Sequence, residues 1–287
     1  MPETTKASLI HRLPLTRLKL FGARCLYRAV RLFVRDDQRQ VTRGGIHYDI
    51  DLSEGIDLSL FLFGNFQSHV SDSRYFSIPR DAVIFDVGAN IGSMCLNFAK
   101  RAPEGLVYAF EPTEYAYNKL LRNLSLNPDI AARIQAIHAY VSNHSAEAQL
   151  VTAYSSWKVD GLEVAVHPIH GGLSRPAEVS RIVTIDEFCR DQGIERVDLI
   201  KTDTDGHELD VLQGARETLR NHRPVVVFEI GDYLLRERGH HFGQFLDLFD
   251  PLGYRLINSK NGMHVTLANY GRELPLKATT DLIALPL

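Results

Sequence analysis

An apolar run followed by a glycine-containing turn is the clearest pattern along the chain. Val83–Val87 is apolar apart from Asp86, residues 88–92 read Gly-Ala-Asn-Ile-Gly, and a helical pattern begins at Met94. Continuous runs of Val, Ile and Phe are typical of strands buried in a parallel sheet. Glycine after such a strand lets a ligand approach the backbone, because no Cβ stands in the way. We therefore expect a ligand-binding loop after this strand.

The alternation of apolar strands and amphipathic helices continues through the middle of the chain. It predicts a mostly parallel, doubly wound α/β sheet with helices on both faces. Thr184 is placed to cap one of these helices. The expected strands after the first are 106–110, 134–141, 197–201, 224–230, 254–258 and 281–287, and the other expected helices are 94–101, 113–124 and 208–221.

Two stretches depart from this alternation. Residues 46–80, here called the lead-in segment, are expected to be short and β-rich, with strands at 46–50 and 58–63. Residues 152–180 lack a strong period and are expected to form a long loop, which in a compact enzyme is more often functional than accidental. The loop carries three ring-bearing side chains that we expect over the acceptor, namely Trp157, His167 and His170.

Positive charge is concentrated at the N-terminus. Residues 1–45 hold ten Lys/Arg against three Asp/Glu, a net charge of +7, which leaves −10 on the rest of a chain whose total is −3. Arginines recur at helical spacing beside an apolar face within residues 14–35, which predicts a basic amphipathic helix. Either that face packs on the rest of the protein, or it makes peripheral contact with an anionic membrane. Nucleic acid is not an expected partner, because the acidic remainder offers no second basic face.

The composition sets broad limits. A chain of 287 residues can bury one large core and a small appendage. Its three cysteines, an odd number without clustered spacing, argue against a disulfide framework or a zinc site. No apolar run reaches the roughly 18 residues of a membrane-spanning helix, and the N-terminus lacks the apolar core of a signal peptide. We expect a cytoplasmic protein, with peripheral contact at the inner membrane face as the alternative.

Polar side chains stand at the ends of successive strands. In an open parallel sheet the ligand lies beyond the carboxyl ends of the strands, so these side chains are expected to converge on one site. They are Asp86, Glu111, Ser142, the run from Asp203 to Glu208, and Glu229.

The first loop favours a methyl donor over a dinucleotide. Its glycines lack the G-x-G-x-x-G spacing of NAD-binding loops. Asp86 would repel a pyrophosphate but attract an ammonium group, such as the amino-acid end of S-adenosylmethionine. Glu111, at the end of the neighbouring strand, stands where a ribose presents its hydroxyls. The sequence thus predicts a site for S-adenosylmethionine at the edge of the sheet.

Five sequence blocks occur together in an order that is specific to one family. The blocks are 86–92, Phe110-Glu-Pro112, 184–188, the run 198–215 with Lys201-Thr-Asp203-Thr-Asp205-Gly206-His-Glu208, and Phe228-Glu-Ile230. With them the chain resembles the FkbM family of S-adenosylmethionine-dependent methyltransferases over residues 60–287. The resemblance implies the class I methyltransferase fold, a Rossmann-like, mostly parallel seven-stranded sheet with an antiparallel last strand. It also implies O-methylation of hydroxyl groups on sugars or polyketide-type natural products.

The chain departs from the family's usual pattern at three positions. Gln67 stands where an acid is common, Asp205 replaces the commoner Glu, and His207 replaces a small residue. These departures leave the expected donor site intact and bear on the chemistry at the acceptor.

Residues at the first three strand ends are the expected donor ligands. Asn90 and Ser93 open a helix whose free N–H groups suit the donor's carboxylate, with helix capping as their alternative role. Glu111 is expected to bind the ribose diol. Ser142 and Asn143 are expected beside the adenine, with a plain turn as the alternative. The expected cofactor-binding residues are Asp86, Gly88, Ala89, Asn90, Gly92, Ser93, Glu111, Pro112, Ser142, Asn143 and Asp203.

An acceptor hydroxyl needs a base or a metal, because an alcohol is a poor nucleophile. Asp203 is the expected base, with donor positioning as its alternative role. His207 is either a base or a structural residue. Asp205 and Glu208 either act at the acceptor or cap the following helix. The expected catalytic residues are Asp203, Asp205, His207 and Glu229.

No metal ion is assigned, although Asp203, Glu229 and Asp232 offer oxygen ligands that suit Mg²⁺ as an alternative. The expected function is methyl transfer from S-adenosylmethionine to a hydroxyl of a saccharide or natural-product intermediate, the acceptor being a small molecule, glycan or glycolipid. A non-catalytic binding protein recruited to a membrane and an NAD-linked oxidoreductase are the alternatives. The expected organisation is a basic helical segment at 1–45, the lead-in segment, and a methyltransferase domain at 81–287 with the insertion at 152–180.

Overall fold

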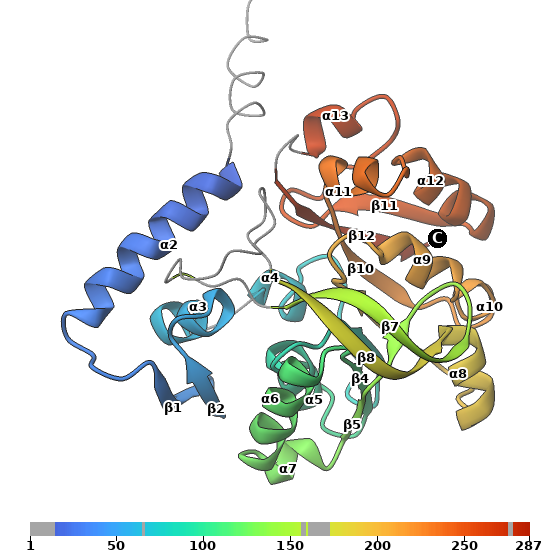
Figure 1. Cartoon of the computed structure of the whole chain (residues 1–287). Coiled ribbons are helices and arrows are strands. Elements are labelled where there is room, and N and C mark those ends of the chain that lie inside the picture. The colour runs from blue at the N-terminus through green and yellow to red at the C-terminus, as the bar shows by residue number, and fades with distance from the viewer. Residues whose placement is uncertain (1–14, 65–66, 156–158, 160–172, 275–277) are drawn as a thin grey trace, which may run out of the picture.

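A computed structural model of the chain describes residues 15–64, 67–155, 159, 173–274 and 278–287. Its centre is a seven-stranded sheet with the strand order β11-β12-β10-β9-β3-β4-β5 (Figure 1). The pairs among β5, β4, β3, β9 and β10 are parallel, whereas β12 runs antiparallel between β10 and β11. The predicted doubly wound, mostly parallel sheet with an antiparallel last strand is confirmed. The strands are β3 (Val83–Val87), β4 (Leu106–Phe110), β5 (Ile134–Ile137), β9 (Leu199–Thr202), β10 (Val225–Ile230), β11 (Tyr254–Asn258) and β12 (Thr280–Pro286).

Helices cover both faces of this sheet (Figure 1). One face is covered by α5 (Ser93–Arg101), α6 (Glu114–Ser125) and α7 (Pro128–Ala131). The other face is covered by α8 (Ile185–Gln192), α9 (Glu208–Gln213), α10 (Arg216–Asn221) and α12 (Gly243–Phe249). Short elements complete the C-terminal half, namely α11 (Asp232–Glu237), the 3₁₀ turn Asp250–Leu252 and α13 (Tyr270–Glu273).

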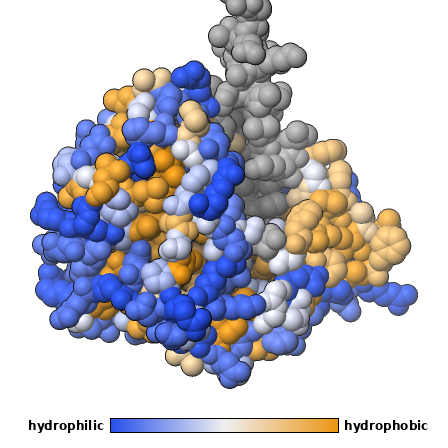
Figure 2. Space-filling model, turned by 180° about the vertical axis from the view of Figure 1, so that it is seen from behind, coloured by the Kyte–Doolittle hydropathy of each residue, from blue (hydrophilic) through white to orange (hydrophobic). Residues whose placement is uncertain are grey.

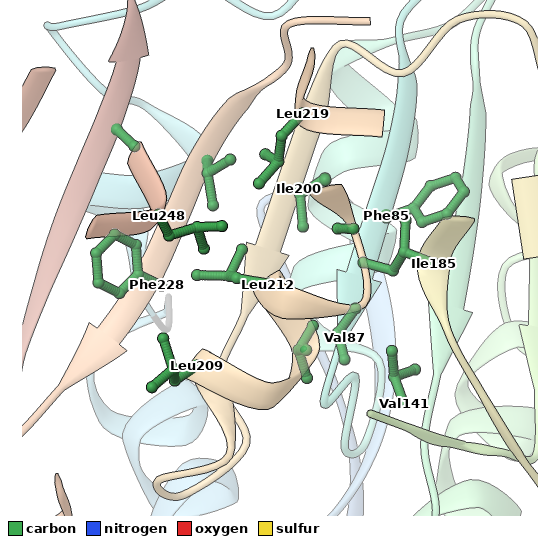
Figure 3. Packing of buried hydrophobic residues seen from close by; sticks show 14 of the residues in the cluster. Phe85, Val87, Val141, Ile185, Ile200, Leu209, Leu212, Leu219, Phe228 and Leu248 are labelled. Atoms are coloured by element: carbon green, nitrogen blue, oxygen red, sulfur yellow. The ribbon is translucent and has the colours of Figure 1, made fainter. Parts of the chain in front are cut away.

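Alternation of side chains along the strands divides the core into two layers. Ile84 belongs to the cluster under α5 and α6, while its neighbour Phe85 belongs to the cluster under α8, α9 and α12. The central strands β3, β4 and β9 are buried on both sides, which explains why they are largely continuous apolar runs. Figure 3 shows the second cluster, in which Phe85, Ile200, Leu212 and Phe228 lie between the sheet and its covering helices.

The N-terminal part forms a helix and a hairpin ahead of the sheet. Helix α2 (Leu15–Arg31) is followed by β1 (Gln38–Arg43) and β2 (Ile46–Asp51), which pair antiparallel. The helical expectation for 1–45 therefore applies to α2 but is wrong for β1, where exposed and half-buried side chains alternate as in a strand. Among the described residues, no helix has both the length and the apolar character needed to cross a membrane.

The strand predicted at 58–63 is wrong, because these residues lie in helix α3 (Gly55–Phe63). The apolar residues occur so densely that they satisfy a two-residue and a helical period equally well. The two ends of the element favour a helix. Asp57 lies in its first turn, and Gly64, in the left-handed conformation, donates its N–H to the Leu60 carbonyl. Helix α4 (Ser68–Ser71) follows and leads toward the sheet edge.

Helix α6 anchors the hairpin to the rest of the protein. The amide of Asn127 accepts from the His47 N–H at 2.8 Å and donates to its carbonyl at 2.7 Å, and Asn123 accepts from the Asp49 N–H at 2.7 Å. These bonds satisfy backbone groups along the free edge of β2, which would otherwise be buried without partners. The Asn123 Nδ2 also donates to the Ile91 carbonyl at 2.8 Å, so the same side chain holds residues 88–92, here called the glycine loop.

The predicted third strand is divided in two. Pairing with β4 ends at Ile137, and the chain turns so that β6 (Tyr140–Val141) joins a separate three-stranded sheet, order β6-β8-β7. The expected loop at 152–180 is also wrong at its two ends. Antiparallel strands β7 (Ala146–Ser155) and β8 (Leu173–Val183) extend into it from both sides. Trp157, His167 and His170, which were expected over the acceptor, lie outside the described residues.

The helix predicted at 208–221 is interrupted after Gln213. A Cβ on Gly214 would lie 2.1 Å from the Ser142 carbonyl oxygen, so the backbone passes too close to the neighbouring segment for a regular continuation. The carboxylate of Asp186 then accepts from the Glu217 and Thr218 N–H groups and starts α10. The predicted cap at Thr184 is confirmed, because its Oγ1 accepts from the Glu187 N–H at 3.0 Å.

Candidate active site

The loops after β3 and β9 touch at Gly88. The φ angle of Gly88 is +80°, and a Cβ built on it would lie 2.0 Å from the Asp203 carbonyl oxygen. Gly92, at φ +90°, has the same requirement, since its Cβ would lie 2.6 Å from the Leu120 side chain. The backbone N–H groups of Gly88 and Ala89 both donate to the Phe110 carbonyl, at 3.0 and 2.9 Å. Glycine is thus needed at positions 88 and 92 for the ends of β3, β4 and β9 to come together.

Glu111 ties the end of β4 to the glycine loop. Its carboxylate accepts from the Asn90 N–H at 3.0 Å, and from the N–H and hydroxyl of Thr113 at 2.9 and 2.6 Å. Burial raises the pKa of Glu111, while these three hydrogen bonds favour its charged form. Because a carboxylate has about four lone-pair directions, this arrangement leaves room for a further donor such as a ribose hydroxyl. Pro112, next along, offers its carbonyl to the His138 Nε2 at 3.0 Å.

A buried lysine links the ends of β3 and β9. Asp86 and Lys201 are direct partners in the parallel register, and the Lys201 Nζ lies 3.2 Å from the Asp86 Oδ1. The ammonium also reaches the Gly88 carbonyl at 3.3 Å and the Asp203 Oδ2 at 3.7 Å. Burial works against the charge of Lys201, but Asp86 and Asp203 raise its pKa. Asp86, expected to meet the donor's ammonium group, thus already faces an ammonium group of the chain itself.

Asp203 stands at the tip of β9 with one oxygen oriented by the protein. Its Oδ2 accepts from the Gln67 Nε2 at 2.8 Å and faces Lys201 at 3.7 Å. The side chain retains 22% of its exposure, more than its buried neighbours Asp86 and Lys201. Both contacts fall on Oδ2, so Oδ1 is the oxygen turned toward other partners. Gln67, noted in the sequence only as a departure from the family pattern, therefore contacts the expected base directly.

The loop from Asp203 to Gly206 is held by the helix that follows it. The buried carboxylate of Glu208 accepts from the Thr204 N–H at 2.7 Å and the Gly206 N–H at 3.2 Å. Burial raises the pKa of Glu208 to about 7. Asp205, at φ +52°, is held in the left-handed region between these two bonds. Burial, together with the charges of Asp203 and Glu208, raises its pKa well above the ordinary value.

Carboxyl groups gather where β9 and β10 end and the antiparallel β12 begins. Burial first, and then the charges of Asp203, Asp281 and Asp205, raise the pKa of Glu229 well above its usual value. Glu229 and Asp281 are cross-strand partners, and the His69 Nε2 lies 2.5 Å from the Asp281 Oδ2. We call Asp203, Asp205, Glu229 and Asp281 the acidic edge. Helix α4, with Gln67 before it and His69 within it, reaches both ends of this edge.

Two expected site residues have partners elsewhere. The Nδ2 of Asn143 donates to Asp210 at 3.0 Å and to Gln213 at 3.2 Å on α9. His207 lies 3.6 Å from Asp210 and edge-on to Tyr140, and burial lowers its pKa. These contacts give Asn143 and His207 structural partners on the outer side of the loop. Ser142 and Ser93 are both buried. The Ser142 N–H donates to the Val183 carbonyl, and Ser93 lies at the start of α5.

The alternative magnesium ligands do not converge. Asp232 pairs with the Arg236 Nε at 2.8 Å within α11. No group of three His, Cys, Asp or Glu side chains in the described part of the chain is arranged to hold a metal ion.

Lys201 and Gln67 are parts of the site whose roles sequence reasoning did not assign, and Glu208, expected to cap α9, accepts from the Thr204 and Gly206 N–H groups of the preceding loop. The sequence did indicate an ion pair at Lys201, since a lysine at the end of an otherwise apolar buried strand needs a counter-charge. Its partner, however, depends on which strands are neighbours. Gln67 lies more than a hundred residues from Asp203 along the chain, and no spacing rule joins them.

Three curated proteins give a measure of how this chain compares with known ones. The methyltransferase SdnD of Sordaria araneosa is 30% identical over 164 residues, 49% of this chain and 63% of that protein. The 2-O-methyltransferase NoeI of Sinorhizobium fredii is 28% identical over 183 residues, 58% of this chain and 71% of that protein. The hexuronic acid methyltransferase AglP of Haloferax volcanii is 24% identical over 147 residues, 51% and 55% respectively. The match thus spans less than two thirds of SdnD and of AglP.

The sequence profile of the methyltransferase FkbM domain matches residues 86–256, more than half of the chain. The matched region begins at Asp86 and includes the glycine loop, Glu111, the Asp203 loop and Glu229. It therefore covers the strand ends that meet in the candidate site, and it matches the family that the sequence blocks resemble. The chain belongs to the FkbM family of methyltransferases.

Proposed function

We propose that the chain uses S-adenosylmethionine to methylate a hydroxyl group of a neutral saccharide or related natural product. The observation that carries the proposal is the contact between the Gly88 loop and Asp203, where a Cβ would stand 2.0 Å from a backbone oxygen. This contact places a glycine loop suited to binding the donor next to the Asp203 carboxylate, which is suited to the acceptor. Bound S-adenosylmethionine would supply an electrophilic methyl group on a positively charged sulfur.

The glycine loop and Glu111 are the proposed donor ligands. Glu111 is buried and held by Asn90 and Thr113, so its remaining lone pairs have fixed directions for the ribose diol. Asp86 would act through Lys201, which it neutralises, by fixing the Gly88 carbonyl rather than by meeting the donor's ammonium group. This assignment keeps Asp86 in the donor site but changes it from a ligand to a positioning residue.

Asp203 is the proposed base. While the acceptor oxygen bonds to the methyl carbon and the carbon–sulfur bond breaks, its Oδ1 would take the hydroxyl proton. Gln67 and Lys201 hold Oδ2, which fixes the direction of the free oxygen. A positioned base of this kind contributes about 10²–10⁴ in rate. Glu229, whose pKa is raised well above normal by burial and by Asp203, Asp281 and Asp205, would serve as a hydrogen-bond donor to the acceptor.

The acidic edge favours a neutral acceptor over an acidic one. Carboxyl oxygens bind sugar hydroxyls well, whereas a uronate placed beside the Asp203 and Asp281 carboxylates would be repelled. NoeI is named a 2-O-methyltransferase and AglP a hexuronic acid methyltransferase. The names support transfer to oxygen on a sugar, and the charge of this edge favours the neutral member of that class.

Calorimetric titration with S-adenosylhomocysteine, with NAD as the comparison ligand, tests the donor site. We expect micromolar binding of S-adenosylhomocysteine alone and its loss in Glu111→Ala. Binding of NAD instead, or of neither ligand, would contradict the proposed donor.

Transfer of a radiolabelled methyl group from S-adenosylmethionine to a panel of neutral and uronic oligosaccharides tests the acceptor and the base. Asp203→Asn should lose about 10²–10⁴ in turnover on the neutral acceptors while keeping donor affinity. Asp232→Asn is the matched control, because Asp232 lies in an ion pair on α11. Equal turnover in the two variants would remove Asp203 as the base, and preference for uronates would overturn the acceptor class.

A further inference from the structure

Within residues 21–31, where its side chains are described, helix α2 packs on the protein with one face. Ala23, Tyr27 and Val30, spaced by four and three residues, lie partly buried against the core cluster under α5 and α6. In Figure 1 the helix extends along the side of the molecule, connected to the rest through β1 and β2. Most of the other side chains between residues 21 and 31 are exposed.

Large apolar side chains occupy part of that free surface. Phe21 is 65% exposed and Leu26 is 43% exposed, and the turn after the helix adds Leu32 at 81% and Phe33 at 88%. Figure 2 shows apolar surface gathered on the projecting side of the molecule, where α2 and α3 lie. Scattered exposed leucines need no explanation, but four such side chains within thirteen residues mark an interaction surface.

Basic side chains lie directly beside the apolar ones. Arg24, Arg28 and Arg31 are exposed and spaced by four and three residues, so they form a row on the helix adjoining that of Phe21 and Cys25. The first 45 residues carry +7, against −10 for the rest of the chain. The net positive charge thus lies in the part of the chain that also exposes these four apolar side chains.

We propose that α2 and the turn after it form a docking surface for an anionic lipid bilayer. Helices that lie in a membrane interface combine aromatic and aliphatic side chains on one face with Lys or Arg beside them. Anionic lipids attract each basic residue near the surface, and Phe21 and Phe33 would enter the boundary between headgroups and acyl chains. A second copy of the chain is a poorer occupant, because the two basic segments would repel each other.

The experiment is co-sedimentation of the full chain with vesicles of phosphatidylcholine alone and of phosphatidylcholine mixed with phosphatidylglycerol. We expect recovery with the anionic vesicles and little with the neutral ones, falling as salt is raised. Arg24→Glu with Arg28→Glu should lower partitioning at least about tenfold. Phe21→Ser with Phe33→Ser should lower it comparably at high salt, where apolar contact dominates.

Matched controls use the same substitutions elsewhere on the surface. Arg216→Glu with Arg220→Glu changes two exposed arginines four residues apart on α10, and Leu267→Ser changes an exposed apolar residue in the C-terminal part. Both should partition like the unchanged chain. Binding of S-adenosylhomocysteine and the Tm, measured for all variants, show that the fold is intact.

Three outcomes would overturn the proposal. Equal recovery of the α2 variants and the controls would mean that α2 does not contact lipid. Equal recovery with neutral and anionic vesicles would remove the role of charge. Self-association without lipid that Phe21→Ser and Phe33→Ser abolish, measured by analytical ultracentrifugation, would assign the surface to a second copy.

Discussion

Gly88 is the residue through which the first loop contacts the fourth strand end, and its substitution should disturb both. In Gly88→Ala the new methyl group meets the Asp203 carbonyl at 2.0 Å and the backbone is held at φ +80°. Gly193→Ala is a matched control, because Gly193 has φ +64° but nothing within 4 Å of its Cβ position. Gly193→Ala should cost about 1–2 kcal/mol in unfolding free energy. Gly88→Ala should cost more and weaken S-adenosylhomocysteine binding at least about tenfold by calorimetry, and equal affinities would contradict the assigned loop contact.

Glu208 should make the stability of the protein depend on pH between about 4.5 and 7. Its pKa is raised from 4.5 to about 7 by burial. Between these values the folded state keeps a proton that the unfolded state releases, so stability is lost as pH rises through this window. Glu208→Gln should flatten this fall by up to about 3 kcal/mol.

Urea unfolding at pH 4.5 and pH 7 measures the effect of Glu208→Gln. Glu217→Gln, on the exposed surface of α10, is the control and should leave the pH profile unchanged. Parallel profiles for Glu208→Gln and the unchanged chain would mean that the Glu208 carboxyl stays charged in the folded protein, against the assigned burial effect.

The placement of single residues was predictable only where it follows from the strand that carries them. Glu111 and Asp203 are found at one edge, as expected, because the strand ends of a parallel sheet meet there. The partner of Asp86 could not be found, because Lys201 lies 115 residues away and faces it only through the register of β3 with β9. Gln67 depends on the same kind of long-range placement, through α4.

Helix α6 depends on a buried charge cluster for its contact with the lead-in segment. The Lys119 Nζ lies 2.9 Å from Glu54 and 2.6 Å from Asp57, and all three side chains are at most 5% exposed. Burial raises the pKa of Asp57 to about 6. Removing one partner of a buried ion pair leaves the other charges buried without compensation. Lys119→Met should therefore lower the free energy of unfolding by about 3–5 kcal/mol.

The exposed pair of Arg80 and Glu104, at 2.8 Å, provides the control for Lys119→Met. Arg80→Met should cost less than about 1 kcal/mol, because exposed pairs are well solvated. Urea unfolding at pH 7 compares the two variants. Similar losses would show that the cluster under α6 is no more important than a surface ion pair.

Elements were predictable where period and burial agree, and were mistaken where a boundary depends on a tertiary contact. The core strands are apolar on both sides and could be located from the sequence. The break between α9 and α10 could not, since it arises where Gly214 and Glu217 meet Ser142 and Asp186. The turn that separates β5 from β6 could not either, since it depends on the pairing of β6 with the distant strand β8. The strand expected at 58–63 is wrong because the apolar residues of α3 fit both periods.

At the scale of the molecule, the lead-in segment contacts both the support of the glycine loop and Asp203. Its β2 is bound to Asn123, which also holds the glycine loop, and the residues before α4 bring Gln67 to Asp203. By contrast, the described side chains of α2 contact the core through one face. We therefore propose that the structural boundary lies between α2 and β1 rather than at residue 45.

Truncation tests this boundary. A chain starting at residue 37 loses α2 but keeps β1 paired with β2, so its unfolding free energy should fall by less than about 2 kcal/mol, a Tm shift below about 8 °C. A chain starting at residue 58 also loses Glu54 and Asp57, and it leaves Lys119 buried without these carboxylates and the Asn123 Oδ1 without its donor on β2. It should fail to fold cooperatively.

Calorimetric affinity for S-adenosylhomocysteine is the deciding readout for the two truncated chains. The shorter deletion should keep it and lose recovery with anionic vesicles, because the proposed donor loop and the helix proposed to dock on lipid lie on opposite sides of the proposed boundary. Loss of donor binding in the shorter deletion would place α2 within the methyltransferase domain. Survival of a folded, donor-binding chain after the longer deletion would show that the sheet does not need the lead-in segment, against the contacts made by α6.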